Sequence, residues 1–266
     1  MRKKVLLTGI FSSFLIANAY AIPGIDLSMG IGYTSLSPSG NMSYVGSGDD
    51  PTINKIDLEN DLNLDNSKKA YAYIDIDLPV LPNLKLEYAP FQYIGSGTLS
   101  GIKFGDKTFN ADVDTDIDFD QYELDLYYGL PIPIITPRIG VALKYLDGNI
   151  TVQDSTDPSK HASADINVPI PMLYAGVTIG VPLIPLVSKF DIDLEGKYLS
   201  ISGNTITELK ALGKIKLLKV PVVGSLYAGL GYKYTRLKID DLDVDDNTFN
   251  ADFKFKGIIG EVGVEF

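Results

Sequence analysis

Apolar and polar residues alternate along most of this chain with a period of two. In residues 25–33, every second residue is apolar, and the residues between them are aspartate, serine and glycine. Successive side chains of a β-strand point to opposite faces, so this pattern gives a strand one apolar face and one polar face. Residues 257–266 alternate in the same way and end on Phe266. The sequence therefore predicts β-strands at both ends of this region.

About eight further segments alternate in the same manner, which brings the prediction to about ten strands. These segments are 70–78, 84–88, 122–128, 139–145, 173–179, 190–198, 209–217 and 226–234.

The predicted connections are of two kinds. Proline-containing turns are expected at 79–83, 130–137, 182–185 and 219–223, because proline cannot donate to a strand ladder. Polar loops are expected at 35–67, from 97 to the strand at 122, and at 147–161, 202–205 and 240–247. Residues 56–64 within the first loop fit either a short strand or a turn of helix. Short turns at one end, longer loops at the other and an even strand count are typical of transmembrane antiparallel up-and-down barrels.

The first 21 residues have the pattern of a secretory signal peptide. A basic start at residues 2–4 is followed by a short, mostly apolar run at residues 5–17 and by the small-residue site Ala19-Tyr20-Ala21. We therefore expect residues 1–21 to be a signal peptide and residues 22–266 to form one outer-membrane β-barrel domain.

Composition narrows the choice of class. Removal of Arg2, Lys3 and Lys4 takes the formal net charge from −11 to −14, which makes nucleic acid an unexpected partner. The chain has no cysteine, which excludes disulfides and thiolate metal sites. No later segment offers the roughly 18 apolar residues of a membrane helix. A periplasmic β-protein and a transmembrane barrel remain, and the position of the proline turns favours the barrel.

Five segments of the chain resemble a known family. Leu81–Tyr88, Leu126–Pro131, Pro171–Tyr174, Gly231–Tyr232 and Asp240–Asp241 are similar to segments of an uncharacterised family of small Gram-negative outer-membrane β-barrel proteins. The resemblance covers most of the mature chain and implies the barrel fold. It implies no catalytic, cofactor-binding or metal-binding residues.

If the apolar alternating residues face lipid, charged residues of both signs line the lumen. We expect cross-strand ion pairs there, for example Asp191 and Asp193 beside Lys214 and Lys216. The expected acidic residues are Asp26, Asp75, Asp77, Glu87, Glu123, Asp125, Asp191, Asp193, Glu195, Glu261 and Glu265. The expected basic residues are Lys85, Arg138, Lys144, Lys197, Lys210, Lys214, Lys216 and Lys233. A narrow barrel filled by such pairs is the first interpretation, and a cation-selective slit is the alternative.

Aromatic residues predict the membrane boundaries and one partner. Tyr33, Tyr145, Tyr198 and Tyr234 end one set of strands, and Tyr128, Phe190 and Phe266 lie near the proline turns. Such girdles are expected where a barrel meets the two membrane–water interfaces. The expected partners are outer-membrane lipid, lipopolysaccharide, and the barrel-assembly machinery through the terminal strand that ends at Phe266.

Two acidic clusters, at residues 112–120 and 241–246, resemble parts of calcium-binding loops. The sixth position of such a loop needs a positive φ and here holds Ile117 or Asp246; a β-branched residue is poorly suited to it. Solvated acidic faces with at most weak binding of divalent cations are therefore expected.

The only histidine, His161, follows a loop that contains Asp154 and Asp157. Ten-stranded outer-membrane proteases use a histidine with several aspartates, which makes an omptin-like hydrolase a third alternative. A general base needs an oriented partner, and the sequence provides none that can be assigned. We expect no catalytic residues, no cofactor and no metal site, and a non-enzymatic barrel with a structural or surface-binding role.

Overall fold

The computed structural model describes residues 25–46, 48–130, 132–182, 187–220, 224–244 and 246–266. The predicted signal peptide lies outside the described residues, as do parts of the predicted proline turns at 130–137, 182–185 and 219–223.

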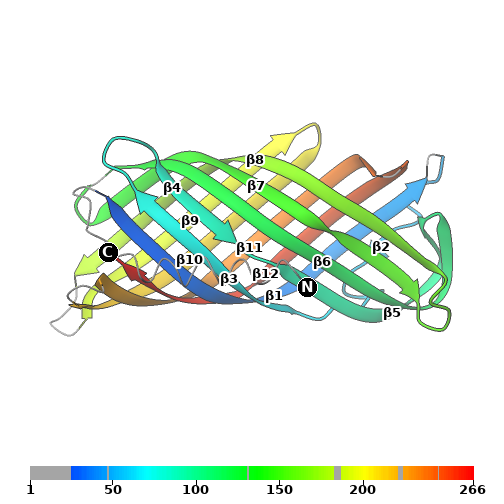
Figure 1. Cartoon of the computed structure of the whole chain (residues 1–266). Helices are drawn as coiled ribbons and strands as arrows, with labels where there is room; N and C mark the ends of the chain where they lie inside the picture. The colour runs from blue at the N-terminus through cyan, green and yellow to red at the C-terminus, as the bar shows by residue number, and fades with distance from the viewer. Residues whose placement is uncertain (1–24, 47, 131, 183–186, 221–223, 245) are drawn as a thin grey trace.

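One sheet of twelve strands closes on itself to form a barrel (Figure 1). Consecutive long strands pair antiparallel, and β12 pairs with β1 to close the ring. The strands are β1 (Asp26–Gly46), β2 (Ile56–Asp57), β3 (Ser67–Asp77), β4 (Asn83–Tyr88), β5 (Phe91–Gly105), β6 (Lys107–Gly129), β7 (Ile135–Asp154), β8 (His161–Pro182), β9 (Val187–Ile201), β10 (Asn204–Val220), β11 (Gly224–Val244) and β12 (Asn247–Glu265). The predicted fold class, a single all-β up-and-down barrel, is confirmed. None of the described residues belongs to a helix long and apolar enough to cross a membrane.

The twelve strands occupy ten positions around the wall. β4 and β5 pair one after the other with β6, so they form a single wall strand that Ala89-Pro90 interrupts. A proline cannot donate to a ladder, which explains the break at this point. β2 has only two residues and pairs with β1 alone. The prediction of about ten strands therefore describes the wall correctly.

Residues 56–65 fill the wall between β1 and β5, beyond the point where β3 begins. The Leu58 amide donates to the Gly40 carbonyl at 2.9 Å, and the Asp65 amide donates to the Ile94 carbonyl at 2.8 Å. A Cβ on Gly97 would overlap the backbone of Asp61, so glycine permits this close approach. The segment is thus a short strand followed by turns, which resolves the two possibilities left open by the sequence.

Several strands are much longer than predicted. Residues 98–121, expected as a loop, belong to β5 and β6, which meet in a tight turn at Asp106. Residues 147–154 likewise continue β7. The prediction was wrong because these extensions carry polar residues on the outer face, and their apolar residues lie in the opposite phase.

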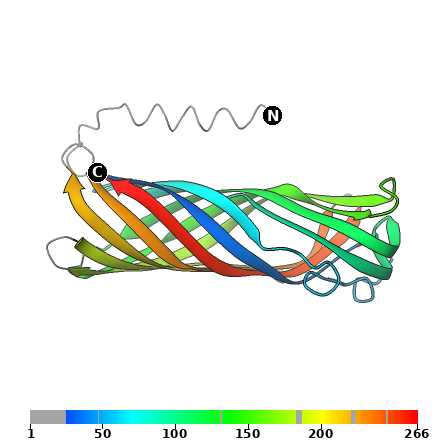
Figure 2. The same cartoon turned by 90° about the horizontal axis from the view of Figure 1, so that it is seen from below.

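We call the half of the barrel that contains Ile25 and Phe266 the proximal half, and the other the distal half. The red β12 ends at the left of Figure 1 beside the start of the blue β1, and the long hairpins reach to the right. Figure 2 shows β1 and β12 side by side along the barrel. Tyr88, Tyr122 and Tyr145, which face one another across β4, β6 and β7, mark the boundary between the halves.

The outer surface of the proximal half is apolar. Its residues include some with more than half of their surface exposed, such as Ile139 at 72% and Leu230 at 69%. The exposed outward residues of this half include Ile31, Leu86, Leu126, Ile139, Val141, Leu143, Leu173, Leu194, Leu209, Ile215, Leu230, Ile258 and Val262. Of the tyrosines predicted for the girdle at its distal edge, Tyr33, Tyr145 and Tyr198 are exposed and Tyr234 is partly buried. Tyr122 and Tyr232 are exposed at the same edge.

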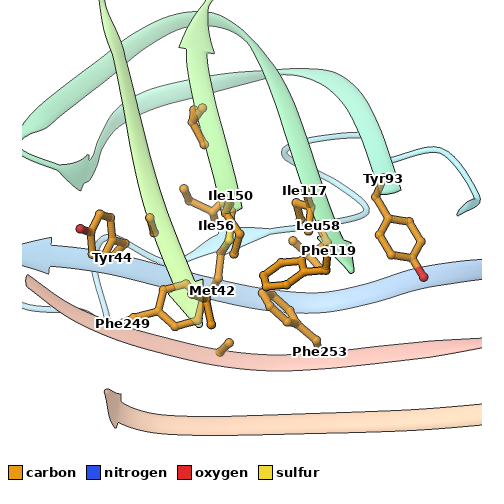
Figure 3. Close-up of a cluster of buried hydrophobic side chains, with 14 of the residues drawn as sticks. Met42, Tyr44, Ile56, Leu58, Tyr93, Ile117, Phe119, Ile150, Phe249 and Phe253 are labelled. Carbon is orange, nitrogen blue, oxygen red and sulfur yellow. The ribbon is translucent and has the colours of Figure 1, made fainter. Parts of the chain in front are cut away.

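The interior of the distal half is a packed apolar core. Ile117 and Phe119 of β6 and Phe249 and Phe253 of β12 gather around Met42 of β1 (Figure 3). The charged lumen was expected only for the short alternating segments, and the distal extensions were expected as loops. In these extensions the same inward phase carries apolar residues.

Candidate functional site

The interior of the proximal half is filled by charged side chains of both signs. An isolated buried charge is costly, so each must be paired to be tolerated. The buried or half-buried acidic residues in ion pairs here are Glu87, Glu123, Asp125, Asp191, Asp193, Glu195, Glu208, Glu261 and Glu265. Their basic partners include Lys85, Arg138, Lys144, Lys197, Lys210, Lys214, Lys216 and Lys233.

Lys144 and Lys197 connect three acidic residues near the middle of the barrel. Lys144 Nζ lies 3.0 Å from Glu123 Oε2 and also pairs with Glu208. Lys197 pairs with Glu123 and lies 2.8 Å from Asp125 Oδ2. These side chains come from β6, β7, β9 and β10, so the ion pairs join different parts of the wall.

A second group of ion pairs lies around Glu195. Lys85 Nζ is 3.1 Å from Glu195 Oε2, and Arg138 Nη1 is 3.5 Å from Glu195 Oε1. The Arg138 guanidinium also pairs with Asp193 and lies 5.6 Å from the centroid of the Tyr127 ring. Arginine suits this position because its planar head can pair and stack at once.

Glu261, on the closing strand, accepts from two tyrosines. The Tyr71 hydroxyl donates to Glu261 Oε2 at 2.7 Å, and the Tyr73 hydroxyl donates to Oε1 at 2.9 Å. Lys214 Nζ lies 3.5 Å from the same carboxylate. A Cβ on Gly32 of β1 would overlap the Tyr71 ring, so the inward glycine makes room for this group.

The sequence predicted most of these charged residues and their pairing. Lys214 lies 3.3 Å from Asp193, and Lys216 lies 3.1 Å from Asp191, as expected. Glu208 was missed, although it precedes Lys210 by two residues and so shares its face. Asp26 and its ladder partner Asp77 lie at the proximal rim and are exposed, so they do not join the buried charges.

The cavity described among these charges is small. A cavity of about 20 Å³ lies between Glu87, Glu123, Lys197 and Lys210. Such a volume holds about one water molecule. The proximal interior therefore has the character of a packed polar core.

The wall of the distal half has a side opening. The β8–β9 ladder ends at the pair Leu173–Tyr198, and the β10–β11 ladder begins at Thr205–Lys238. Residues 161–172 of β8 therefore have no described strand partner on the side away from β7. In Figure 1 the yellow β9–β10 hairpin ends before the neighbouring green strands reach the right-hand end.

Two prolines lie on this free edge. Pro169 and Pro171 are exposed and pair across to β7 at Tyr145 and Leu143. Proline in a sheet is confined to edge strands and bulges, where its missing N–H loses no partner. Their positions agree with an edge that stays open.

An apolar cavity of about 240 Å³ lies behind the opening. Its lining reaches from the exposed Pro171 and Ile201 at the wall to the buried Ile117 and Phe253. The other lining residues are Phe91, Phe119, Leu146, Ile166, Val168, Pro169, Ile170, Leu199, Asn204, Ile206, Leu237, Lys238, Ile239, Leu242 and Phe255. The cavity thus passes through the wall into the apolar core.

The alternation of the sequence did not predict this cavity. A signal was present in β12, where the inward residues Phe249, Phe253 and Phe255 are apolar while Ile258 and Val262 are apolar in the opposite phase. The change of phase occurs across Lys256-Gly257 and marks the passage from one half to the other. The gap between β8 and β11 depends on strand register, which alternation does not determine.

The aspartates of residues 112–120 form a column on the outer face of β6. These aspartates lie within a strand, which corrects the prediction that they lie in a loop. Hydrogen bonds from β5 occupy several of them: Thr98 donates to Asp112 at 2.6 Å, and Ser96 donates to Asp114 at 2.7 Å.

The second acidic cluster lies at the β11–β12 turn. Asp241 and Asp246 have φ values of 54° and 64°, so Asp246 can occupy a position that requires positive φ. Asp245 lies outside the described residues. Within the described ranges, no three histidine, cysteine or acidic side chains gather closely enough to hold a metal ion.

His161 is exposed at the start of β8. Its Nδ1 lies 3.2 Å from the carbonyl oxygen of Pro158. The Thr156 amide and hydroxyl donate to Asp154 Oδ1 at 3.0 and 2.8 Å, which lowers the pKa of Asp154. Asp154 and Asp157 therefore accept hydrogen bonds from their own loop, and no described contact joins them to His161.

No family model and no curated protein matches the chain. Solved structures that match include the outer membrane protease OmpT from Escherichia coli, with a TM-score of 0.47 and 10% identity over 91% of this chain and 96% of that one. Ail, the attachment invasion locus protein of Yersinia pestis, matches in complex with the heparin analogue sucrose octasulfate, with a TM-score of 0.37 and 12% identity over 91% and 99% of the two chains. A second structure of Ail gives a TM-score of 0.35 and 10% identity over 91% and 98%.

Proposed function

We propose that this protein is a non-enzymatic integral outer-membrane barrel of a Gram-negative bacterium, exported by a cleaved signal peptide. Its proximal half spans the membrane, and its distal half stands outside the cell as a surface-binding module. The apolar outer band and the tyrosines at its edge support the membrane position of the proximal half. The aspartate column on the outer wall of β6 supports a position of the distal half in water.

The packed charges of the proximal interior carry the main part of the proposal. Lys144, Lys197 and Glu123 have side chains that are 2%, 6% and 3% exposed, and each has a partner. A conducting path needs water-filled space along the axis, and the pairs from β4 to β12 occupy that space. We therefore expect the membrane half to be closed to ions.

Phe266 fits the proposed assembly signal. The Phe266 amide donates to the Leu27 carbonyl at 2.8 Å, so the last residue extends the seam between β12 and β1. We propose that the barrel-assembly machinery recognises this strand. A Phe266→Asp variant should insert poorly, and unchanged surface levels at equal expression would contradict this.

Conductance in planar bilayers tests the proposed closure. The refolded protein, checked by its heat-dependent gel shift, should give no stable channels. Stable cation-selective currents that are lost in Asp191→Asn/Asp193→Asn would establish the alternative, a narrow cation-preferring pore. Irregular current fluctuations without a defined single-channel step would not establish a pore.

The assignment as a non-enzyme has its own test. Purified protein should not hydrolyse a library of peptides. Hydrolysis that is lost in His161→Ala but kept in Ser159→Ala would overturn the assignment and favour an omptin-like hydrolase.

Lipopolysaccharide and divalent cations remain proposed partners of the acidic outer wall. Asp112, Asp114 and Asp116 already accept hydrogen bonds from β5, so cation binding there should be weak.

A further inference from the structure

We propose that the apolar cavity behind the side opening binds the hydrocarbon chain of an anionic amphiphile. The hydrocarbon chain enters between β8 and β11, on the distal side of the β9–β10 hairpin. The head group of the amphiphile stays at the mouth of the cavity. This inference rests on the proposed function in one respect: the opening faces the outer surface of the membrane.

The lining defines the chemistry of the occupant. Nearly all residues around the cavity are aliphatic, aromatic or proline, so its lining matches a hydrocarbon occupant. A dry cavity of about 150 Å³ is already large enough to hold a benzene molecule. The cavity here, at about 240 Å³, exceeds that size and offers water few polar partners.

The shape of the space favours a chain over a compact molecule. A second cavity of about 60 Å³ continues inward and shares Phe91, Leu146, Ile170, Ile206, Leu237 and Phe255 with the first. Together the two cavities run from the wall at Ile201 toward Lys144 and Glu208, at the distal end of the charged interior. Two adjoining spaces that extend from the wall toward the interior suit a single acyl chain.

The mouth supplies a cation for the head group. Lys238 lines the cavity, and its half-exposed side chain lies 3.7 Å from Asp240, itself 52% exposed. An exposed pair of this kind is weak, so a carboxylate or phosphate can compete for the lysine. Asn204 also lines the mouth, and its Oδ1 accepts from the Asp240 amide at 2.8 Å.

The position of the opening along the barrel axis gives a hydrocarbon chain a route to the cavity. Tyr198, at the last β8–β9 pair, and Tyr145, opposite Pro169, belong to the aromatic girdle. The opening therefore begins where the apolar outer band ends. Both a free amphiphile from the medium and an acyl chain of a membrane lipid can reach this level.

Fluorescence quenching tests the inference, because the native chain contains no tryptophan. Ile201→Trp places one reporter at the mouth, and Leu230→Trp places one on the outer apolar band as a control for probe dissolved in the bilayer. The full mature protein, refolded in phosphatidylglycerol vesicles, is titrated with ω-bromo fatty acids of six to sixteen carbons. Burial of one methylene is worth about 0.8 kcal/mol, so affinity at Ile201→Trp should rise about fourfold per methylene and then level off when the chain fills the cavity.

Two variants separate cavity binding from general partition. Val168→Phe, made in the Ile201→Trp protein, narrows the cavity and should weaken quenching at least tenfold. Asn167 is exposed on the same strand, so Asn167→Phe should leave the quenching unchanged. Lys238→Gln should weaken binding of a bromo fatty acid more than that of the matching bromo alcohol, and Lys256→Gln should affect neither.

A second arm identifies the source of the chain. Vesicles made with brominated phosphatidylglycerol, without free fatty acid, should quench Ile201→Trp beyond Leu230→Trp if a membrane lipid inserts its chain. Quenching only by added fatty acid would assign a free amphiphile. Quenching in both arms that never exceeds the Leu230→Trp control, or that ignores Val168→Phe in a protein with a native gel shift, would overturn the inference. Conductance does not enter this result, so failure here leaves the proposed closure untouched, and a conducting barrel could still bind the chain.

Discussion

The two halves of strand β6 carry opposite arrangements of the same residue types. In the proximal half, Leu124 faces outward and Glu123 faces inward and is buried. In the distal half, Asp118 faces outward, and Ile117 and Phe119 face inward and are buried. The phase of the strand is constant between these positions, so only the polarity of the two faces changes.

The proposed surroundings of the two halves account for this difference in the composition of their cores. Where the outside is lipid, apolar residues gain nothing from moving inward, and the interior is free to hold paired charges. Where the outside is water, burial of apolar side chains is the main favourable term. One continuous sheet therefore joins a polar core to an apolar core, and the apolar cavity lies near the level at which they meet.

Removal of one charge from the proximal core should have the largest effect. Lys144→Ala leaves Glu208 without its described ion partner, and loss of one member of a buried pair costs about 3–5 kcal/mol. Urea unfolding of the protein in vesicles measures this loss. Lys256→Ala, at an exposed lysine, is the control and should stay within about 0.5 kcal/mol of the native protein.

Equal free energies of unfolding for Lys144→Ala and Lys256→Ala would contradict the presence of a paired charged core. The double variant Lys144→Met/Glu208→Leu is a second test, because removal of both charges should restore part of the lost stability.

A matched pair of lysine substitutions on the outer face of β7 should have the next largest effect. Val141 lies on the apolar band and is 53% exposed, whereas Thr151 lies on the same face ten residues further on, in the distal half. A lysine near the membrane midplane costs about 2–4 kcal/mol, and a lysine in water costs almost nothing. The free energy of unfolding should therefore fall for Val141→Lys and not for Thr151→Lys. Equal losses would mean that both positions share one environment.

The sequence predicted the proximal half well because its apolar outer residues stand at every second position in one phase. The ion pairs of Asp191 and Asp193 followed from that phase, since residues on one face of adjacent strands meet. The strands of the distal half were not predicted, for two physical reasons. Its outer aspartates have the composition of a loop, and its inward apolar residues, such as Ile117 and Phe253, break the phase of the proximal strands. The side opening was beyond prediction, because it depends on where the β9–β10 hairpin ends relative to β8 and β11.

The smallest effect is expected at an ion pair on the outer wall of the distal half. Arg236 Nε and Nη2 donate to Asp252 at 2.9 and 2.8 Å, and this pairing lowers the pKa of Asp252. A lowered folded-state pKa gives stability that is present above the unfolded value of 3.8 and is lost as the pH falls through the folded value. Arg236→Gln should therefore reduce stability slightly at pH 7 and not at pH 2. High salt should also shrink the difference, because both side chains are partly exposed. A difference that grows toward acid pH would contradict the assignment.

Cysteine labelling along β6 tests the exchange of polarity between the two halves most directly, because the native chain has no cysteine. Single variants Asp116→Cys, Ile117→Cys and Leu124→Cys are refolded in vesicles and treated with a water-soluble or a membrane-soluble maleimide. We expect Asp116→Cys to react rapidly with the water-soluble reagent, Leu124→Cys to react only with the membrane-soluble reagent, and Ile117→Cys to react with neither until the protein is unfolded. Equal reaction of Asp116→Cys and Leu124→Cys with the water-soluble reagent would show that both halves meet the same solvent and would contradict the account.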